Sequence, residues 1–119
     1  IDSPSSDFST VASHQFTVKS LSVPQNVKAE KYESTSYPGI KLSWDTTNAP
    51  YYHIYWSESN NSGTAKKLTS TSLAYDTIYE SSYDLQKGRT YYFWVKSANG
   101  YSPADSDSAF SSVASFTYN

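Results

Sequence analysis

The sequence predicts an all-β fold, a seven-stranded antiparallel sandwich. Apolar and polar residues alternate with a period of two in a series of short runs, as half-buried strands require. Clusters of turn-forming residues separate these runs, and no stretch shows the sustained apolar period of 3.6 residues that marks a helix. Seven such runs within about 95 residues are typical of two packed antiparallel sheets.

Each expected strand is marked by its alternating residues. In chain order these are Val27 and Ala29; Ile40, Leu42 and Trp44; Tyr52, Ile54 and Trp56; Leu68; Tyr83 and Leu85; Tyr91, Phe93 and Val95; and Val113, Ser115 and Thr117. Aromatic side chains bury the most apolar area per residue. We therefore expect the core to be built around Trp44, Tyr52, Trp56, Tyr91 and Phe93.

The composition excludes several classes of function. A chain of 119 residues is one domain on length alone, and the absence of cysteine excludes disulfides and thiolate metal sites. The net charge is −2 with no basic stripe, which argues against a nucleic-acid partner. No apolar run approaches the roughly 20 residues of a membrane-spanning helix, so membrane insertion is not expected. The surface is rich in Ser and Tyr and poor in charge, as in many extracellular or cell-surface proteins.

The chain repeats a short segment of itself. Residues 8–13 (FSTVAS) return as residues 110–115 (FSSVAS), with five of six residues identical and an offset of 102. This period is about the length of one β-sandwich domain. We therefore expect residues 1–20 to be the last strand of a preceding repeat plus a linker, and residues 21–119 to be one complete domain. Because a lone strand carries unpaired backbone groups, we expect residues 8–17 to pair with an edge of this domain or with another molecule.

Further motifs occur in a characteristic order. Pro24 precedes the first strand, the second strand ends in Trp44, and the third begins with Tyr52. The most specific run is residues 85–91 (LQKGRTY), which is followed by alternating apolar residues and an Ala-Asn-Gly turn at residues 98–100. Together these motifs resemble a fibronectin type III domain, in the style of bacterial extracellular copies.

The resemblance covers about residues 22–119 and implies an immunoglobulin-like sandwich. In such a sandwich the third and sixth strands share a sheet, and the hydroxyl of Tyr91 would bond to nearby backbone. Two segments depart from the family pattern: residues 73–82 are long and Tyr-rich, and residues 102–108 lengthen the last connection.

No residue pattern points to catalysis, and we expect no catalytic residue, cofactor or metal ion. The two histidines, His14 and His53, lie far apart in the sequence and belong to no recognisable Ser-His-acid pattern. Asp105 and Asp107 begin like a calcium loop, but the glycine and glutamate that such a loop needs are missing, so a solvated turn is expected. The chain is therefore not expected to be an enzyme.

The outward positions of the third and sixth strands are unusually aromatic. His53 and Tyr55 on one strand and Tyr92 and Trp94 on the other would form one patch on the solvent face of the sheet. Such a patch either stabilises the sheet through cross-strand pairs and cover by another segment, or contacts a protein, or stacks on sugar rings.

Two functional hypotheses follow from these observations. The first is a non-catalytic spacer or protein-interaction module of a larger extracellular or cell-surface protein, joined to neighbouring domains of the same chain. The alternative is a carbohydrate-binding module that uses the aromatic patch, with a polysaccharide as its ligand.

Overall fold

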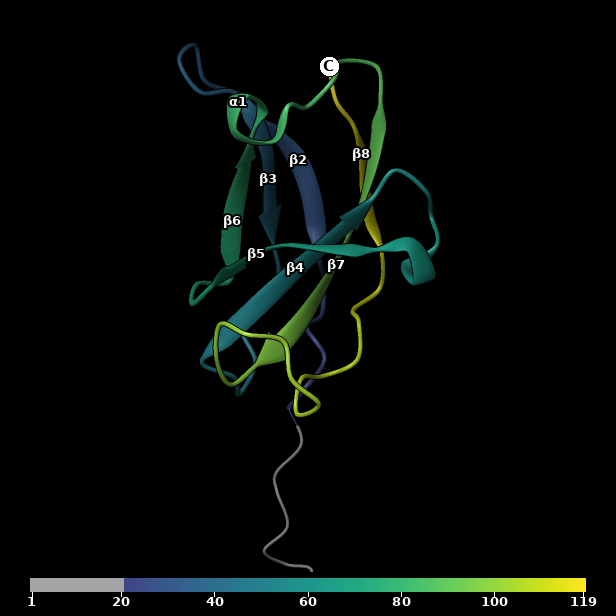
Figure 1. Cartoon of the computed structure of the whole chain (residues 1–119). Coiled ribbons are helices and arrows are strands. Elements are labelled where there is room, and N and C mark those ends of the chain that lie inside the picture. The colour runs from purple at the N-terminus through teal and green to yellow at the C-terminus, as the bar shows by residue number, and fades with distance from the viewer. Residues whose placement is uncertain (1–20) are drawn as a thin grey trace, which may run out of the picture.

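The computed structural model describes residues 21–119, and the strand expected within residues 1–20 lies outside them. The described residues form two antiparallel sheets that pack face to face (Figure 1). In chain order the elements are β2 (Lys28–Tyr32), β3 (Gly39–Ser43), β4 (Tyr51–Ser57), the 3-10 turn η2 (Ser62–Thr64), β5 (Lys66–Thr71), β6 (Tyr75–Tyr79), α1 (Glu80–Tyr83), β7 (Thr90–Ala98) and β8 (Ala114–Thr117). The prediction of an all-β chain with seven strands is confirmed for these residues.

The strands divide into a three-stranded sheet, β2-β3-β6, and a four-stranded sheet, β5-β4-β7-β8. The longest pairing joins β4 to β7, from Tyr51 opposite Ala98 to Ser57 opposite Tyr92. Because successive side chains of a strand point to opposite faces, this register gives the two strands one inner and one outer face. The inner face builds the core and the outer face carries the predicted aromatic patch.

The core lies between the two sheets. Ile40, Ile54 and Phe93 have no exposed surface, and the same cluster contains the predicted core residues Trp44, Tyr52 and Tyr91. The fifth predicted core residue, Trp56, is only partly buried and packs at the margin of the cluster. The large rings therefore supply most of the buried apolar area, as the sequence indicates.

The hydroxyl groups of two buried tyrosines each accept a hydrogen bond from a backbone N–H group. The backbone N–H of Gln86 donates to the hydroxyl of Tyr91 at 2.8 Å, and the N–H of Thr47 donates to the hydroxyl of Tyr52 at 2.8 Å. In each case the donor lies five residues upstream, in the connection that leads into the strand. The backbone hydrogen bond expected of Tyr91 is therefore present, and both connections are tied to the core.

The last strand, β8, has the reverse of the expected alternation, because Ala114 and Tyr118 are buried whereas Val113, Ser115 and Thr117 are exposed. The strand expected at Tyr83 and Leu85 was placed wrongly. The strand in this region is β6, and Tyr83 ends the single turn α1. Alternation misses β6 because Ile78 is its only fully buried apolar residue. The strand is held instead by backbone pairing with β3, where a Cβ on Gly39 would lie 2.2 Å from the carbonyl oxygen of Ile78.

Candidate functional site

The predicted patch lies on the outer face of the four-stranded sheet, but half of it is covered. Tyr55 pairs with Trp94 across β4 and β7, and His53 and Tyr92 lie on the same face. His53 is 0% exposed and Trp94 is 4% exposed. The expectation that all four residues face solvent is therefore wrong for these two, whereas Tyr55 and Tyr92 remain partly exposed.

The cover is the long connection between β7 and β8, residues 99–113. The ring of Phe110 meets Tyr55 nearly at right angles, with centroids 5.0 Å apart, and lies 6.1 Å from Trp94. The ammonium group of Lys96 sits 4.5 Å from the centre of the Phe110 ring. Near the other end of β4, Tyr101 packs on Tyr51 at 4.4 Å. The connection that departed from the family pattern therefore fills the space that a ligand of this patch would need.

Two serines fasten this connection to the edge of β7. The backbone N–H of Ser108 donates to the Ser97 carbonyl, and the Ser97 N–H donates back to the Ser108 hydroxyl at 2.9 Å. Ser111 repeats the arrangement with Val95, again with 2.9 Å from the N–H to the hydroxyl. In both pairs a side-chain oxygen takes the place of a strand carbonyl. The connection thus provides hydrogen-bond partners for the backbone groups at the edge of β7, although it is not a regular strand.

His53 joins the sheet to the same connection. Its Nδ1 lies 2.7 Å from Ser70 Oγ, and its Nε2 lies 3.8 Å from Asp107 Oδ2. Burial lowers the pKa of His53 below its ordinary value of 6.5, and the Asp107 carboxylate partly offsets this. The side chain of Asp107 is only 3% exposed, so the expectation of a solvated turn is wrong for this residue.

The residues Ser70, His53 and Asp107 do not have the geometry of a nucleophilic site. The His53 ring has no exposed surface, and 3.8 Å is too long for a hydrogen bond to Asp107. The Ser70 hydroxyl also donates to the carbonyl of Tyr101 in the connection. The arrangement therefore suits a clamp that holds the connection against the sheet.

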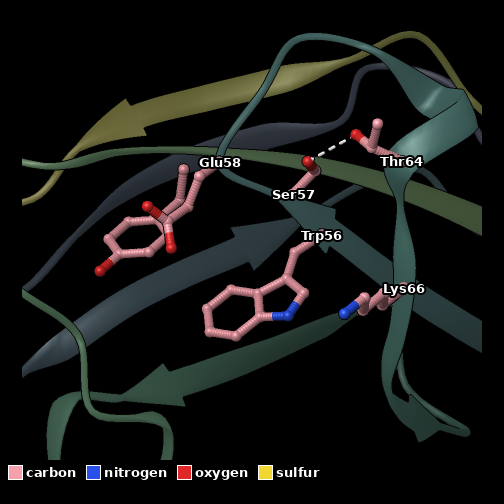
Figure 2. Close-up of a pocket in the computed structure, with 6 residues that line it drawn as sticks. Trp56, Ser57, Glu58, Thr64 and Lys66 are labelled. Atoms are coloured by element: carbon pink, nitrogen blue, oxygen red, sulfur yellow. Dashed lines mark hydrogen bonds between the residues drawn. The ribbon is translucent and has the colours of Figure 1, made fainter.

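A second aromatic region lies where β4 ends, and it is hollowed rather than covered. Two hollows meet over Trp56, Glu58 and Tyr91. The first, called here the Lys66 hollow, has a volume of about 290 Å³ and is also lined by Ser57, Thr64 and Lys66 (Figure 2). The second, the Arg89 hollow, has a volume of about 360 Å³ and extends over Tyr83, Asp84, Gln86 and Arg89.

The Trp56 ring is fixed by its aromatic neighbours. It stacks on Tyr91 with centroids 5.4 Å apart and an angle of 14° between the planes. Tyr83 from α1 meets its edge at 5.8 Å. Because one face of the indole rests on the core and the ring also lines both hollows, Trp56 offers a preformed apolar wall.

Polar groups of both charge signs surround this wall. Arg89 donates to the Glu58 carboxylate at 2.6 Å, in a pair whose side chains are 55% and 60% exposed. Lys66 lies opposite Trp56 across β4 and β5. Both residues line the Lys66 hollow, and the amine of Lys66 and the indole nitrogen point toward one another (Figure 2). Within residues 21–119 no acceptor pairs with either of these two donors.

Sequence reasoning assigned Trp56 to the core and gave Lys66, Glu58 and Arg89 no role. The available signal was the position of Trp56 as the last apolar residue of its strand, directly before a polar stretch. No group of three or more metal-binding side chains occurs among residues 21–119. No helix in that part of the chain has the length and apolar character needed to cross a membrane.

Comparisons with known proteins give structural likeness only. No protein-family model and no curated protein matches the chain. A β-1,2-glucanase from Parabacteroides distasonis matches 86% of this chain at 21% identity with a TM-score of 0.63, and two structures of the pectate lyase Pel3 from Pectobacterium carotovorum match 76% and 79% at 19% and 18% identity, each with a TM-score of 0.53. The matches span 13%, 26% and 27% of those longer chains. At these identities the likeness shows a shared fold alone.

Proposed function

We propose that this chain is a non-catalytic, fibronectin type III-like module of a larger bacterial extracellular or cell-surface protein. Its role is to space and present neighbouring domains of the same chain, and to contact other macromolecules through its surface. The observation that carries this proposal is the division of the strands into sheets of three and four, with the third and sixth strands side by side.

Local details support the same family assignment. The third and sixth strands, β4 and β7, lie side by side in one sheet, as the resemblance implied. The hydroxyl of Tyr91 accepts a hydrogen bond from the backbone of Gln86, as expected of the tyrosine at this place in such sandwiches. Pro24, which precedes the first strand in the family pattern, is fully buried.

The placement of the two ends of the described region suits a head-to-tail array. Ser22 accepts a hydrogen bond from Ser97 through its carbonyl, at the end of the sandwich away from α1. Tyr118 donates to Glu80 of α1 at the opposite end (Figure 1). A domain whose ends lie at opposite poles adds its full length to an array, as a spacer requires.

The structural neighbours support a setting in polysaccharide-acting proteins. Their names describe enzymes that act on β-1,2-glucan and pectate, and this fold accounts for only 13% and 26% of those chains. A region of that share has the size of an appended domain. We extend this setting to the present chain as part of the proposal, since fold by itself does not fix function.

The experiment that tests this proposal has two parts. The purified chain is incubated with β-1,2-glucan and with pectate, and product release is measured as new reducing ends and unsaturated uronates; we expect no release above a heat-denatured control. Two copies of residues 21–119 joined by residues 1–20 are then measured by small-angle scattering. We expect an extended particle about twice as long as the single unit, and either turnover or a compact side-by-side pair would contradict the proposal.

The alternative function is carbohydrate binding through His53, Tyr55, Tyr92 and Trp94. The structure disfavours binding at these residues, because the outer face on which they lie is covered. Phe110 and the rest of the β7–β8 connection cover that surface. The hollows around Trp56 are the place where an observation favours binding of a sugar.

A further inference from the structure

We propose that the Lys66 hollow binds a uronic-acid residue of an acidic polysaccharide. The sugar ring would lie against Trp56, and its carboxylate would be held by the amine of Lys66 and the indole N–H of Trp56. This inference rests on the proposed function, because it gives the non-catalytic module a ligand.

Two hydrogen-bond donors lie together in the lining of the hollow. Lys66 and Trp56 are cross-strand partners that line the same space, and their nitrogens point toward one another (Figure 2). Both groups are hydrogen-bond donors without acceptor capacity. No described residue accepts from either of them. Two donors that face one gap, one of them cationic, select an anionic oxygen acceptor, for which a carboxylate provides two oxygens.

The charges around the hollow favour an anionic ligand. Glu58 is the one acidic residue of its lining, and Arg89 neutralises that carboxylate at 2.6 Å. The cation of Lys66 is therefore left without a counter-charge, which gives the hollow a net charge of about +1. A carboxylate entering beside Lys66 meets attraction rather than repulsion.

The other groups of the lining favour a sugar over other carboxylates. Glu58 can accept hydrogen bonds from hydroxyl groups, and Ser57 and Thr64 place two further hydroxyls, 2.7 Å apart, on the same lining. The indole of Trp56 supplies a flat apolar wall for the C–H face of a ring. A ligand with a carboxylate, several hydroxyls and an apolar ring face matches all three features, and a uronic acid has this chemistry. An acidic peptide has the carboxylate but lacks a ring that carries several hydroxyl groups.

The size of the hollow agrees with a short stretch of polysaccharide. The Lys66 hollow has about 290 Å³, and it continues over Trp56 into the Arg89 hollow of about 360 Å³. Together they lie within the usual range of small-ligand sites. One sugar would occupy the Lys66 hollow and the next would pass over the Glu58–Arg89 pair.

The test is binding of a galacturonate trisaccharide, measured by calorimetry and by tryptophan fluorescence. Trp44 and Trp94 are 6% and 4% exposed, so Trp56 is the tryptophan whose emission responds to a ligand in the hollow. We expect Lys66→Gln to weaken binding by about tenfold or more, because a charge-assisted hydrogen bond is lost. Trp56→Phe keeps an aromatic wall and removes the indole N–H, and we expect it to weaken binding several-fold.

Lys67→Gln is the matched control. Lys67 lies next to Lys66 on the same strand but is paired with Tyr55, and its side chain points to the other face of the sheet. The two variants lose the same charge, so only their position differs. We expect Lys67→Gln to bind within about twofold of the unchanged protein.

Three results would overturn the inference. The first is no binding of the trisaccharide at millimolar concentration, and the second is an equal loss for Lys66→Gln and Lys67→Gln, which would indicate general charge attraction. The third is equally tight binding of the methyl-esterified trisaccharide, which lacks the anionic carboxylate. None of these outcomes bears on the absence of turnover, so failure of this site and failure of the non-catalytic proposal are told apart by the product-release assay.

Discussion

The outer face of the four-stranded sheet and the Trp56 end of the same sheet carry similar residues, but the first surface is covered and the second is open to solvent. Both place aromatic rings and a lysine on paired strands. On the outer face, Phe110 and the connection around it leave Trp94 only 4% exposed. At the other site no segment of the described chain closes over Trp56, and the ring lines two hollows.

This difference shows that the aromatic pattern of a strand does not decide whether its surface is free to bind. What decides is whether another segment is long enough, and carries the right side chains, to reach that surface. The β7–β8 connection is long, and it brings Phe110 together with the two serines that bond to β7. The β4–β5 connection is shorter and polar, and it runs on the side of Ser57 and Thr64, away from the Trp56 ring (Figure 2).

The largest expected effect comes from removing the cover. Phe110→Ala deletes the ring that packs on Tyr55 and Trp94, and we expect the free energy of unfolding to fall by about 2–3 kcal/mol, since Phe110 is only partly buried. Urea denaturation measures this change. Val113→Ala in the same connection is the control, because Val113 is 39% exposed. If the two variants lose equal stability, the outer face does not depend on Phe110.

The next effect tests the serine contacts. Ser111→Ala leaves the buried N–H of Val95 without its acceptor, and we expect a loss of about 1–2 kcal/mol in the free energy of unfolding. The neighbouring Ser112→Ala is the matched control, because the Ser112 side chain is exposed and makes no hydrogen bond to the sheet. Faster amide exchange at Val95 in Ser111→Ala would show that the bond itself is lost. Equal stability of the two alanine variants would contradict this role.

A smaller effect is expected from pH. Burial lowers the pKa of His53 in the folded state below its ordinary value of 6.5, so the folded chain binds fewer protons than the unfolded chain as the pH approaches that pKa. The contribution to stability is therefore complete above about pH 6.5 and is lost as the pH falls below it.

Thermal unfolding between pH 5 and pH 8 measures this contribution, and His53→Asn should flatten the profile. A profile that is unchanged by His53→Asn would assign the pH dependence to another group.

The smallest effect is expected at the open end. The Glu58–Arg89 pair is more than half exposed, so Arg89→Gln should lower the free energy of unfolding by less than about 1 kcal/mol. The difference should shrink further at high salt concentration, because exposed pairs are screened. A loss as large as that of Phe110→Ala would mean that the two regions are equally integrated into the fold, which would remove the contrast between them.

Much of the fold could be predicted from local patterns. Alternation located the strands around Ile40, Ile54 and Phe93, because each of them has one face turned to the core. It failed at β6, where Ile78 alone is fully buried among the apolar residues and the strand depends on backbone pairing with β3. A strand held mainly by its backbone leaves little trace in the order of its side chains.

The candidate site was less accessible to sequence reasoning. The outer positions of His53 and Trp94 follow from period-two alternation and were predicted, but their burial depends on the β7–β8 connection. Phe110, which packs on Trp94, lies 16 residues beyond it in the chain, and Asp107 lies beside His53. The Lys66 hollow joins residues from β4, β5 and the start of β7. Such a grouping depends on strand register, and no single segment encodes register.

The sequence by itself determined that this chain forms strands, that Trp44, Tyr52, Tyr91 and Phe93 enter the core, and that the outer positions of β4 and β7 are aromatic. These properties depend on the two-residue period of a strand and on the hydrophobicity of single side chains. Only the tertiary structure decided which aromatic surface stays open, because cover is a contact between segments far apart in the chain. The closed outer face and the open hollow at Trp56 differ for that reason.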